Sequence, residues 1–173
     1  MNKIKIFIII LLFSTISNYS YGQNIAYANL DTVIKTSNVG KDIIAYFSKK
    51  NENLINKLKK EEKVIREKEK SLLSQKNILE ADEFSKKINK IREEVKNFNY
   101  NNKNKIKQIN DEKEKVLKSF LEEINKVLKE FAEKNNIDII LSSNQMLIGK
   151  SNLDVTKDLL DIVNKKIENF KLE

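Results

Sequence analysis

Residues 42–135 read DIIAYFSKKNENLINKLKKEEKVIREKEKSLLSQKNILEADEFSKKINKIREEVKNFNYNNKNKIKQINDEKEKVLKSFLEEINKVLKEFAEKN and contain neither proline nor glycine. Charged residues alternate in this stretch with single apolar residues, and no residue in it is a strong helix breaker. We therefore predict one long helical region. What lies outside it is short, so the rest of the chain must be explained by how it packs around the ends of this region.

Apolar residues recur within the stretch at three- and four-residue steps, in two series that a break separates. The first series extends from Ile43 to Leu72 and describes one narrow apolar stripe. The second advances by about 3.6 residues per step, the period of a straight helix rather than of a sustained left-handed supercoil. Because the periodicity is lost over residues 75–82, we predict a hairpin turn there. The second series consists of Phe84, Ile88, Ile91, Val95, Phe98, Asn102, Ile106, Ile109, Lys113, Val116, Phe120, Ile124, Val127 and Phe131.

Two runs typical of β-strands flank the helical region. Residues 25–30 read IAYANL and residues 137–141 read IDIIL, both rich in residues that favour strands. If the two strands lie side by side, the helical region must return on itself near the midpoint between them. That midpoint falls close to residue 84, which supports the hairpin independently. We also predict that residues 146–148 form a strand that pairs with residues 137–141 as a β-hairpin.

Two short helices complete the predicted fold. The first follows Leu30 and should break at residues 38–40, because Asn and Gly favour the C-terminal end of a helix. The second is the C-terminal helix, which begins near Asp154 or Thr156 and carries Leu159 to Phe170 on its buried side.

The predicted fold is α+β and mostly helical, with a long antiparallel helical hairpin that projects from a small β-rich body. We assign residues 23–40 and 136–173 to the body and residues 41–135 to the arm, with the turn near 75–83. Such a small body buries too little surface to be stable alone, and its strands leave open edges. We therefore expect oligomerisation. Its candidate residues are Ile25, Tyr27, Leu30, Ile137, Ile139, Ile140, Leu141 and Leu147.

The positive charge of the chain is concentrated on the arm. The whole chain has a formal charge of +8, and residues 41–134 hold 25 basic and 18 acidic residues. The excess is largest in the half nearest the turn. These charges are read either as a solvated, ion-paired helix pair or as an attraction to an acidic partner such as an acidic protein or an anionic lipid. No nucleic-acid-binding motif accompanies them, so nucleic acid is not expected as a partner. The basic candidates for a client-facing surface are Lys57, Lys59, Lys60, Lys63, Arg66, Lys86, Lys87, Lys90 and Arg92.

Composition and the N-terminus restrict the function further. Cysteine and histidine are absent, which removes thiol nucleophiles, imidazole bases, disulfides and Cys/His zinc sites. We expect neither an enzyme nor a cofactor or metal site. Residues 1–22 have a basic start, an apolar run and small residues at Ser20 and Gly22, the pattern of a cleaved signal peptide. We therefore expect an exported chain.

The layout resembles that of the Skp/OmpH family of periplasmic chaperones. The resemblance covers the residue 25–30 strand, the long charged helical insertion, the residue 137–141 strand and the closing DVTKDLL at residues 154–160. It implies a periplasmic homotrimer, in which the strands of three chains form one β-body and three helical hairpins surround a cavity. It also implies that unfolded outer-membrane β-barrel proteins are held there without ATP, and that lipopolysaccharide is a further partner at residues the resemblance does not place.

Two other functions remain open from the residues. A scaffolding coiled coil of the cell envelope fits the arm, although it does not require the flanking strands. A cationic binder of anionic surfaces fits the charge, and its binding would weaken steeply with salt.

Overall fold

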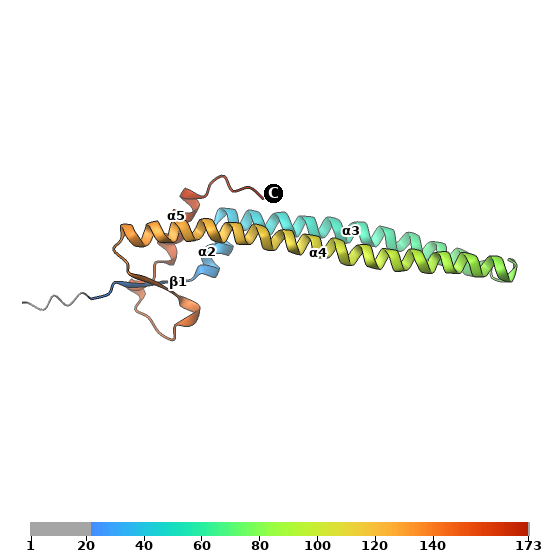
Figure 1. Cartoon of the computed structure of the whole chain (residues 1–173), viewed down its shortest axis with the longest axis horizontal. Coiled ribbons are helices and arrows are strands. Elements are labelled where there is room, and N and C mark those ends of the chain that lie inside the picture. Colours follow the sequence, from blue (N-terminus) through green and yellow to red (C-terminus); the bar gives the residue numbers. More distant parts are fainter. Residues whose placement is uncertain (1–21, 173) are drawn as a thin grey trace, which may run out of the picture.

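The computed structural model describes residues 22–172. In chain order its elements are strand β1 (Ile25–Ala28), helices α2 (Leu30–Thr36), α3 (Asn38–Ser74) and α4 (Ala81–Lys134), strand β2 (Ile139–Ser142), 3-10 turns η1 (Ser143–Gln145) and η2 (Ser151–Leu153), and helix α5 (Thr156–Lys166). Helices α3 and α4 form a long arm that projects from a small body (Figure 1). The predicted mostly helical α+β fold is confirmed, while its assembly into a trimer stays a prediction. The predicted signal peptide lies outside the described residues except for Gly22.

The chain bends sharply where α2 meets α3. Ser37 adopts an extended conformation with φ −61° and ψ 157°, and its Oγ accepts a hydrogen bond from the Gly40 N–H at 3.2 Å. It is thus the N-terminal cap of α3. The predicted first helix is present as α2, but its predicted break at residues 38–40 is wrong, because α2 ends at Thr36 and Gly40 already belongs to α3. Its small size serves the bend instead: a Cβ on Gly40 would overlap the carbonyl oxygen of Ile34 in α2.

The arm is an antiparallel pair of helices linked by residues 75–80, which fall within the predicted turn region. Its fully buried residues are concentrated near the body, where Ile43 and Phe47 of α3 face the C-terminal half of α4. Toward the turn the facing residues are only half-buried, apart from Leu72 at 5% exposed. The buried residues of α4 are Ile109, Val116, Phe120, Ile124, Val127 and Phe131.

The second predicted apolar series is wrong in the middle of α4. Val95 is 37% exposed and Ile106 is 47% exposed, and Lys113 is also exposed. The half-buried positions lie one residue earlier, at Glu94, Lys105 and Glu112. The two series coincide again after each of these positions, from Phe98 to Phe131, so the mean period of about 3.6 residues is kept. What differs is only where the three- and four-residue steps fall.

The two strands lie side by side, as the hairpin argument required. They pair in parallel, with Ile25 opposite Ile139 and Ala28 opposite Ser142. Parallel strands need a long crossover connection, and the whole arm together with α2 serves as that connection. The second edge of β1 is partly covered, because Val155 N–H donates to the Tyr27 carbonyl oxygen at 2.9 Å.

The predicted β-hairpin of residues 137–141 and 146–148 is not formed. After β2 the chain enters η1, and Leu147 and Ile148 are 106% and 91% exposed with no strand conformation. Asn144 Nδ2 donates to Asp31 Oδ2 at 3.1 Å, which directs this loop toward the start of α2 instead of back along β2. Strand β2 thus pairs with β1 and with no other described strand.

One hydrophobic core joins the body to the near end of the arm. Leu159 and Val163 of α5 are 0% and 1% exposed and share this core with Val33 of α2 and Phe120 of α4. Phe120 also packs edge-to-face against Phe170, with ring centroids 5.4 Å apart. This core therefore fixes the arm at its base. Farther from the body, α3 and α4 contact only each other among residues 22–172.

Candidate functional site

The outer part of the arm exposes single apolar side chains between charged ones. On α3 these include Ile55 and Val64, each about half exposed. On α4, Tyr100 is 66% exposed and Ile106 is 47% exposed. These side chains are scattered along the arm, so its surface offers many weak apolar contacts.

The predicted basic residues are all exposed but do not converge on one site. The first five, Lys57 to Arg66, lie on α3, and the remaining four, Lys86 to Arg92, lie on α4. Several are paired with acidic neighbours on their own helix, as Arg66 Nη2 with Glu62 Oε1 at 2.7 Å and Lys87 Nζ with Glu83 Oε1 at 2.8 Å. Glu62 raises the pKa of Arg66 through a hydrogen bond. The surface is therefore a mixed charged surface with a positive excess.

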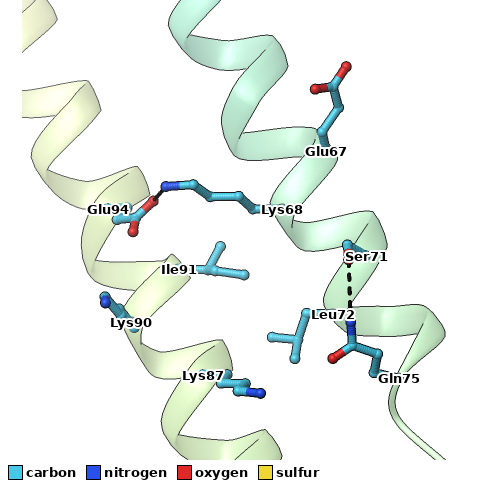
Figure 2. Close-up of a pocket in the computed structure, with 9 residues that line it drawn as sticks. All are labelled: Glu67, Lys68, Ser71, Leu72, Gln75, Lys87, Lys90, Ile91 and Glu94. Carbon is cyan, nitrogen blue, oxygen red and sulfur yellow. Dashed lines mark hydrogen bonds and ion pairs between the residues drawn. The ribbon is translucent and has the colours of Figure 1, made fainter.

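A hollow of about 500 Å³ lies between the helices near the turn. Figure 2 shows Leu72 and Ile91 directed toward each other across the helix pair, while Lys68 extends from α3 to Glu94 on α4. The Lys68 Nζ to Glu94 Oε2 distance is 2.8 Å. The residues that line this hollow are Glu67, Lys68, Ser71, Leu72, Gln75, Lys87, Lys90, Ile91 and Glu94.

This hollow brings together only two of the predicted basic residues, Lys87 and Lys90. The other charged residues of this hollow, Glu67, Lys68 and Glu94, were not among the predicted candidates. The place of the turn could have indicated them, because it determines which residues of the two helices face each other. Chemically, the hollow combines amines with a small apolar floor and contains no nucleophile paired with a base. Its arrangement suits reversible binding rather than catalysis.

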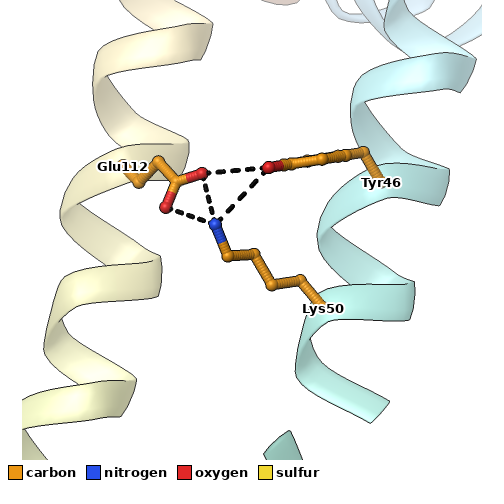
Figure 3. A network of polar contacts seen from close by, with 3 residues as sticks. All are labelled: Tyr46, Lys50 and Glu112. Atoms are coloured by element: carbon orange, nitrogen blue, oxygen red, sulfur yellow. Dashed lines mark hydrogen bonds and ion pairs between the residues drawn. The ribbon is translucent and has the colours of Figure 1, made fainter. Parts of the chain in front are cut away.

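A second polar cluster joins the helices closer to the body. Figure 3 shows Lys50 of α3 directed at the Glu112 carboxylate of α4, with the Tyr46 hydroxyl beside them. Lys50 Nζ lies 2.6 Å from both oxygens of Glu112, and the Tyr46 hydroxyl donates to Glu112 Oε1 at 3.3 Å. The hydrogen bond to Glu112 raises the pKa of Lys50. This cluster links the two helices where the buried core of the arm gives way to the half-buried part.

The body presents the predicted oligomerisation residues in two groups. Tyr27, Leu30, Ile137 and Ile140 are half-buried within the chain. Ile25, Ile139 and Leu141 are 40%, 40% and 42% exposed, and Leu147 is fully exposed. Pairing of the strands places Ile25 opposite Ile139 and Tyr27 opposite Leu141. Ile148, which follows Leu147 and was not among the predicted residues, is 91% exposed.

An open strand edge accompanies these exposed apolar residues. Within residues 22–172, β2 has a ladder with β1 on one side only. Unpaired strand edges bind further strands readily, and exposed Leu147 and Ile148 add apolar surface to the same region. Among the helices of residues 22–172, none combines the length and the apolarity needed to cross a bilayer.

Comparisons with known proteins agree with this architecture. The family model described as "Outer membrane protein (OmpH-like)" matches residues 24–163. Among solved structures, the chain is similar to a protein from Caulobacter crescentus CB15 described as an OmpH-like outer membrane chaperone. The two share 14% sequence identity with a TM-score of 0.79, over 88% of this chain and 94% of the other. A comparison with curated proteins gives no match.

Proposed function

Because this chain belongs to the OmpH-like family of outer membrane proteins, we propose that it is a periplasmic chaperone that holds unfolded outer-membrane β-barrel proteins and prevents their aggregation. Holding requires no ATP in this proposal. The description of the similar Caulobacter protein as an outer membrane chaperone supports it.

The observation that carries the proposal is the form of the arm. A holding chaperone needs many weak contacts that do not select one sequence, because its client has no fixed structure. The arm has isolated exposed apolar residues such as Ile55 and Ile106, separated by charged residues along two long helices. At 1.5 Å per residue, the 37 residues of α3 extend about 55 Å, enough to contact a long stretch of unfolded chain.

We further propose that three copies assemble through the body. The open edge of β2 and the exposed side chains of Ile139, Leu141 and Leu147 support this assembly, since strands from neighbouring copies would pair the edge and cover the apolar surface. In this arrangement residues 23–40 and 136–173 form the common body, residues 41–135 form each arm, and residues 1–22 direct export.

The basic excess of the arm has a role in recruitment in this proposal. The nine candidates from Lys57 to Arg92 are exposed, and long-range attraction would steer acidic clients or anionic lipid, including lipopolysaccharide, toward the arm. Such steering depends on ionic strength, so salt should slow capture more than it weakens the final complex.

The experiment that tests the function combines mass and activity. The exported chain is expected to have the mass of a trimer in light scattering. At near-stoichiometric ratio and without nucleotide, it should suppress the aggregation of an outer-membrane β-barrel protein diluted from urea. A stable monomer with no suppression would refute the proposal, and a trimer with no suppression would favour a scaffolding coiled coil.

A further inference from the structure

Helix α4 carries a row of carboxamide side chains on one side of its middle part. Asn97, Asn101, Asn104 and Gln108 follow one another at steps of four, three and four residues, which places them on one face of the helix. None of the four carboxamides has a side-chain hydrogen bond to another residue in the range 22–172. Asparagine is a poor helix former, so helix stability does not explain this row.

A hollow of about 390 Å³ adjoins the start of the row. Asn97 and Asn101 line it together with Val64, Ile65 and Phe98. Val64 is 51% exposed, and the side chains of Ile65 and Phe98 are half-buried. Hydrogen-bonding groups and an apolar floor therefore occur at one place on the arm.

The charges around this hollow do not favour an anionic ligand. Its charged lining residues are Glu61 and Glu94, of which Glu94 is paired with Lys68, and no lysine or arginine lines it. A phosphate or lipid headgroup would find no positive partner in the lining, in contrast to the hollow near the turn, where three lysines lie. A neutral or locally basic ligand with apolar side chains and its own donors and acceptors fits this lining better.

The same segment of α4 has an unpaired hydrogen-bond acceptor buried between the two helices. Asn102 Oδ1 is buried and has no hydrogen-bond partner among the described residues. The ion pairs between the two helices, Lys50 with Glu112 and Lys68 with Glu94, lie on either side of the segment. This segment therefore has a buried acceptor that a ligand or water can still satisfy.

We propose that this face of the arm, the carboxamide row with its adjoining hollow, binds an extended segment of unfolded polypeptide through its main chain. Each carboxamide has both donors and an acceptor, as has each main-chain amide of an unfolded chain. From Asn97 to Gln108 the row spans 11 residues of helix, a rise of about 16.5 Å. An extended chain covers that length in about five residues at about 3.3 Å each, so the four carboxamides lie along one short client segment. An apolar client side chain then packs on Val64, Ile65 and Phe98. The inference rests on the proposed chaperone function and gives it a sequence-independent binding site.

A matched pair of triple variants tests this inference. Asn97→Ala/Asn101→Ala/Asn104→Ala removes three of the four carboxamides of the row, while Asn99→Ala/Asn110→Ala/Asn125→Ala removes three exposed asparagines from other sides of α4. Alanine favours helix at all six positions, so circular dichroism should show both variants folded. The probe is a fluorescently labelled outer-membrane β-barrel protein diluted from urea. Loss of the row should weaken its binding about tenfold, the effect of one or two hydrogen bonds, and the control triple should bind like the parent.

The outcomes separate this inference from the proposed function. If the parent chain does not bind the labelled protein, both fail. If the parent and both triple variants bind equally, or if both variants lose affinity equally, the row is not the binding site and only this inference is overturned. A photo-crosslinking residue at position 101 should label the client strongly and one at position 99 weakly; the reverse pattern would also overturn it.

Discussion

Single residues determine how the arm leaves the body. The bend between α2 and α3 depends on Ser37, which is completely buried and caps α3. It also depends on Gly40, whose missing side chain leaves space for the Ile34 carbonyl oxygen. The two residues therefore set the direction in which the arm projects.

We predict that Gly40→Ala destabilises the chain, although alanine usually stabilises a helix by about 1 kcal/mol relative to glycine. The added Cβ would overlap the Ile34 carbonyl oxygen, and such overpacking costs about 1–3 kcal/mol. Chemical denaturation measures the loss. Lys41→Ala, an exposed neighbour in the same helix, is the control and should change stability by less than about 0.5 kcal/mol. A gain in stability for Gly40→Ala would show that the close approach does not exist.

A second residue-scale prediction concerns the Lys50–Glu112 pair. Hydrogen bonding to Glu112 raises the pKa of Lys50 above its ordinary value of 10.5. The stabilisation is therefore fully present below pH 10.5 and is lost as the pH rises through the folded-state pKa. We expect Lys50→Gln to lower the melting temperature slightly at neutral pH, by an amount that shrinks above pH 10.5. A difference that grew with rising pH would contradict this assignment.

At the scale of elements, the arm has two parts held by different means. Near the body, α3 and α4 share a buried core that includes Phe47 and Phe120. Beyond it, half-buried side chains and the pairs Lys50–Glu112 and Lys68–Glu94 connect the helices. Exposed ion pairs stabilise little, so stability should fall from the body toward the turn.

Two phenylalanine substitutions on α4 measure this gradient. Phe120→Ala removes a side chain that is 0% exposed, and we expect a loss of about 3–5 kcal/mol. Phe84, near the turn, is only half-buried, so Phe84→Ala should cost about 1 kcal/mol. Hydrogen exchange should likewise be fastest near the turn. Equal losses for the two variants, with equal hydrogen exchange at both ends of the arm, would contradict this gradient.

At the scale of the whole molecule, the body is incomplete within one chain. Over residues 22–172 it has two strands, an open edge along β2, and exposed apolar residues that include Leu147 and Ile148. Covering them by other copies is the physical reason to expect assembly.

We predict that Ile139→Lys/Leu141→Lys converts the proposed trimer to a monomer, because both side chains are exposed and the added charges would repel a neighbouring strand. Light scattering measures the mass, and circular dichroism checks that the helices remain. The matched control is Ile55→Lys/Ile106→Lys, two changes at similarly exposed apolar positions of the arm. It should leave the mass unchanged. A trimer that persists in the strand variant would place the interface elsewhere.

Local patterns predicted much of this fold. The two apolar series and the break between them indicated a helical hairpin, and the flanking strands indicated where its ends meet. The same patterns failed at Gly40, which reads as a helix stop, and at residues 146–148, which read as a strand. In both places the conformation depends on a contact with α2, which no local pattern contains.

For the candidate sites, too, local patterns predicted one part and tertiary contacts decided the other. The sequence by itself determined that the arm is long, basic and lacking in catalytic side chains, because composition and helical periodicity are local properties of the chain. Only the tertiary structure decided that the strands are parallel, that Lys68 meets Glu94, and that Asn97 and Asn101 share a hollow with Val64 and Phe98. These facts depend on the rotation and register of one helix against another. A shift of one residue there turns a side chain by about 100°, which a periodic pattern alone does not resolve.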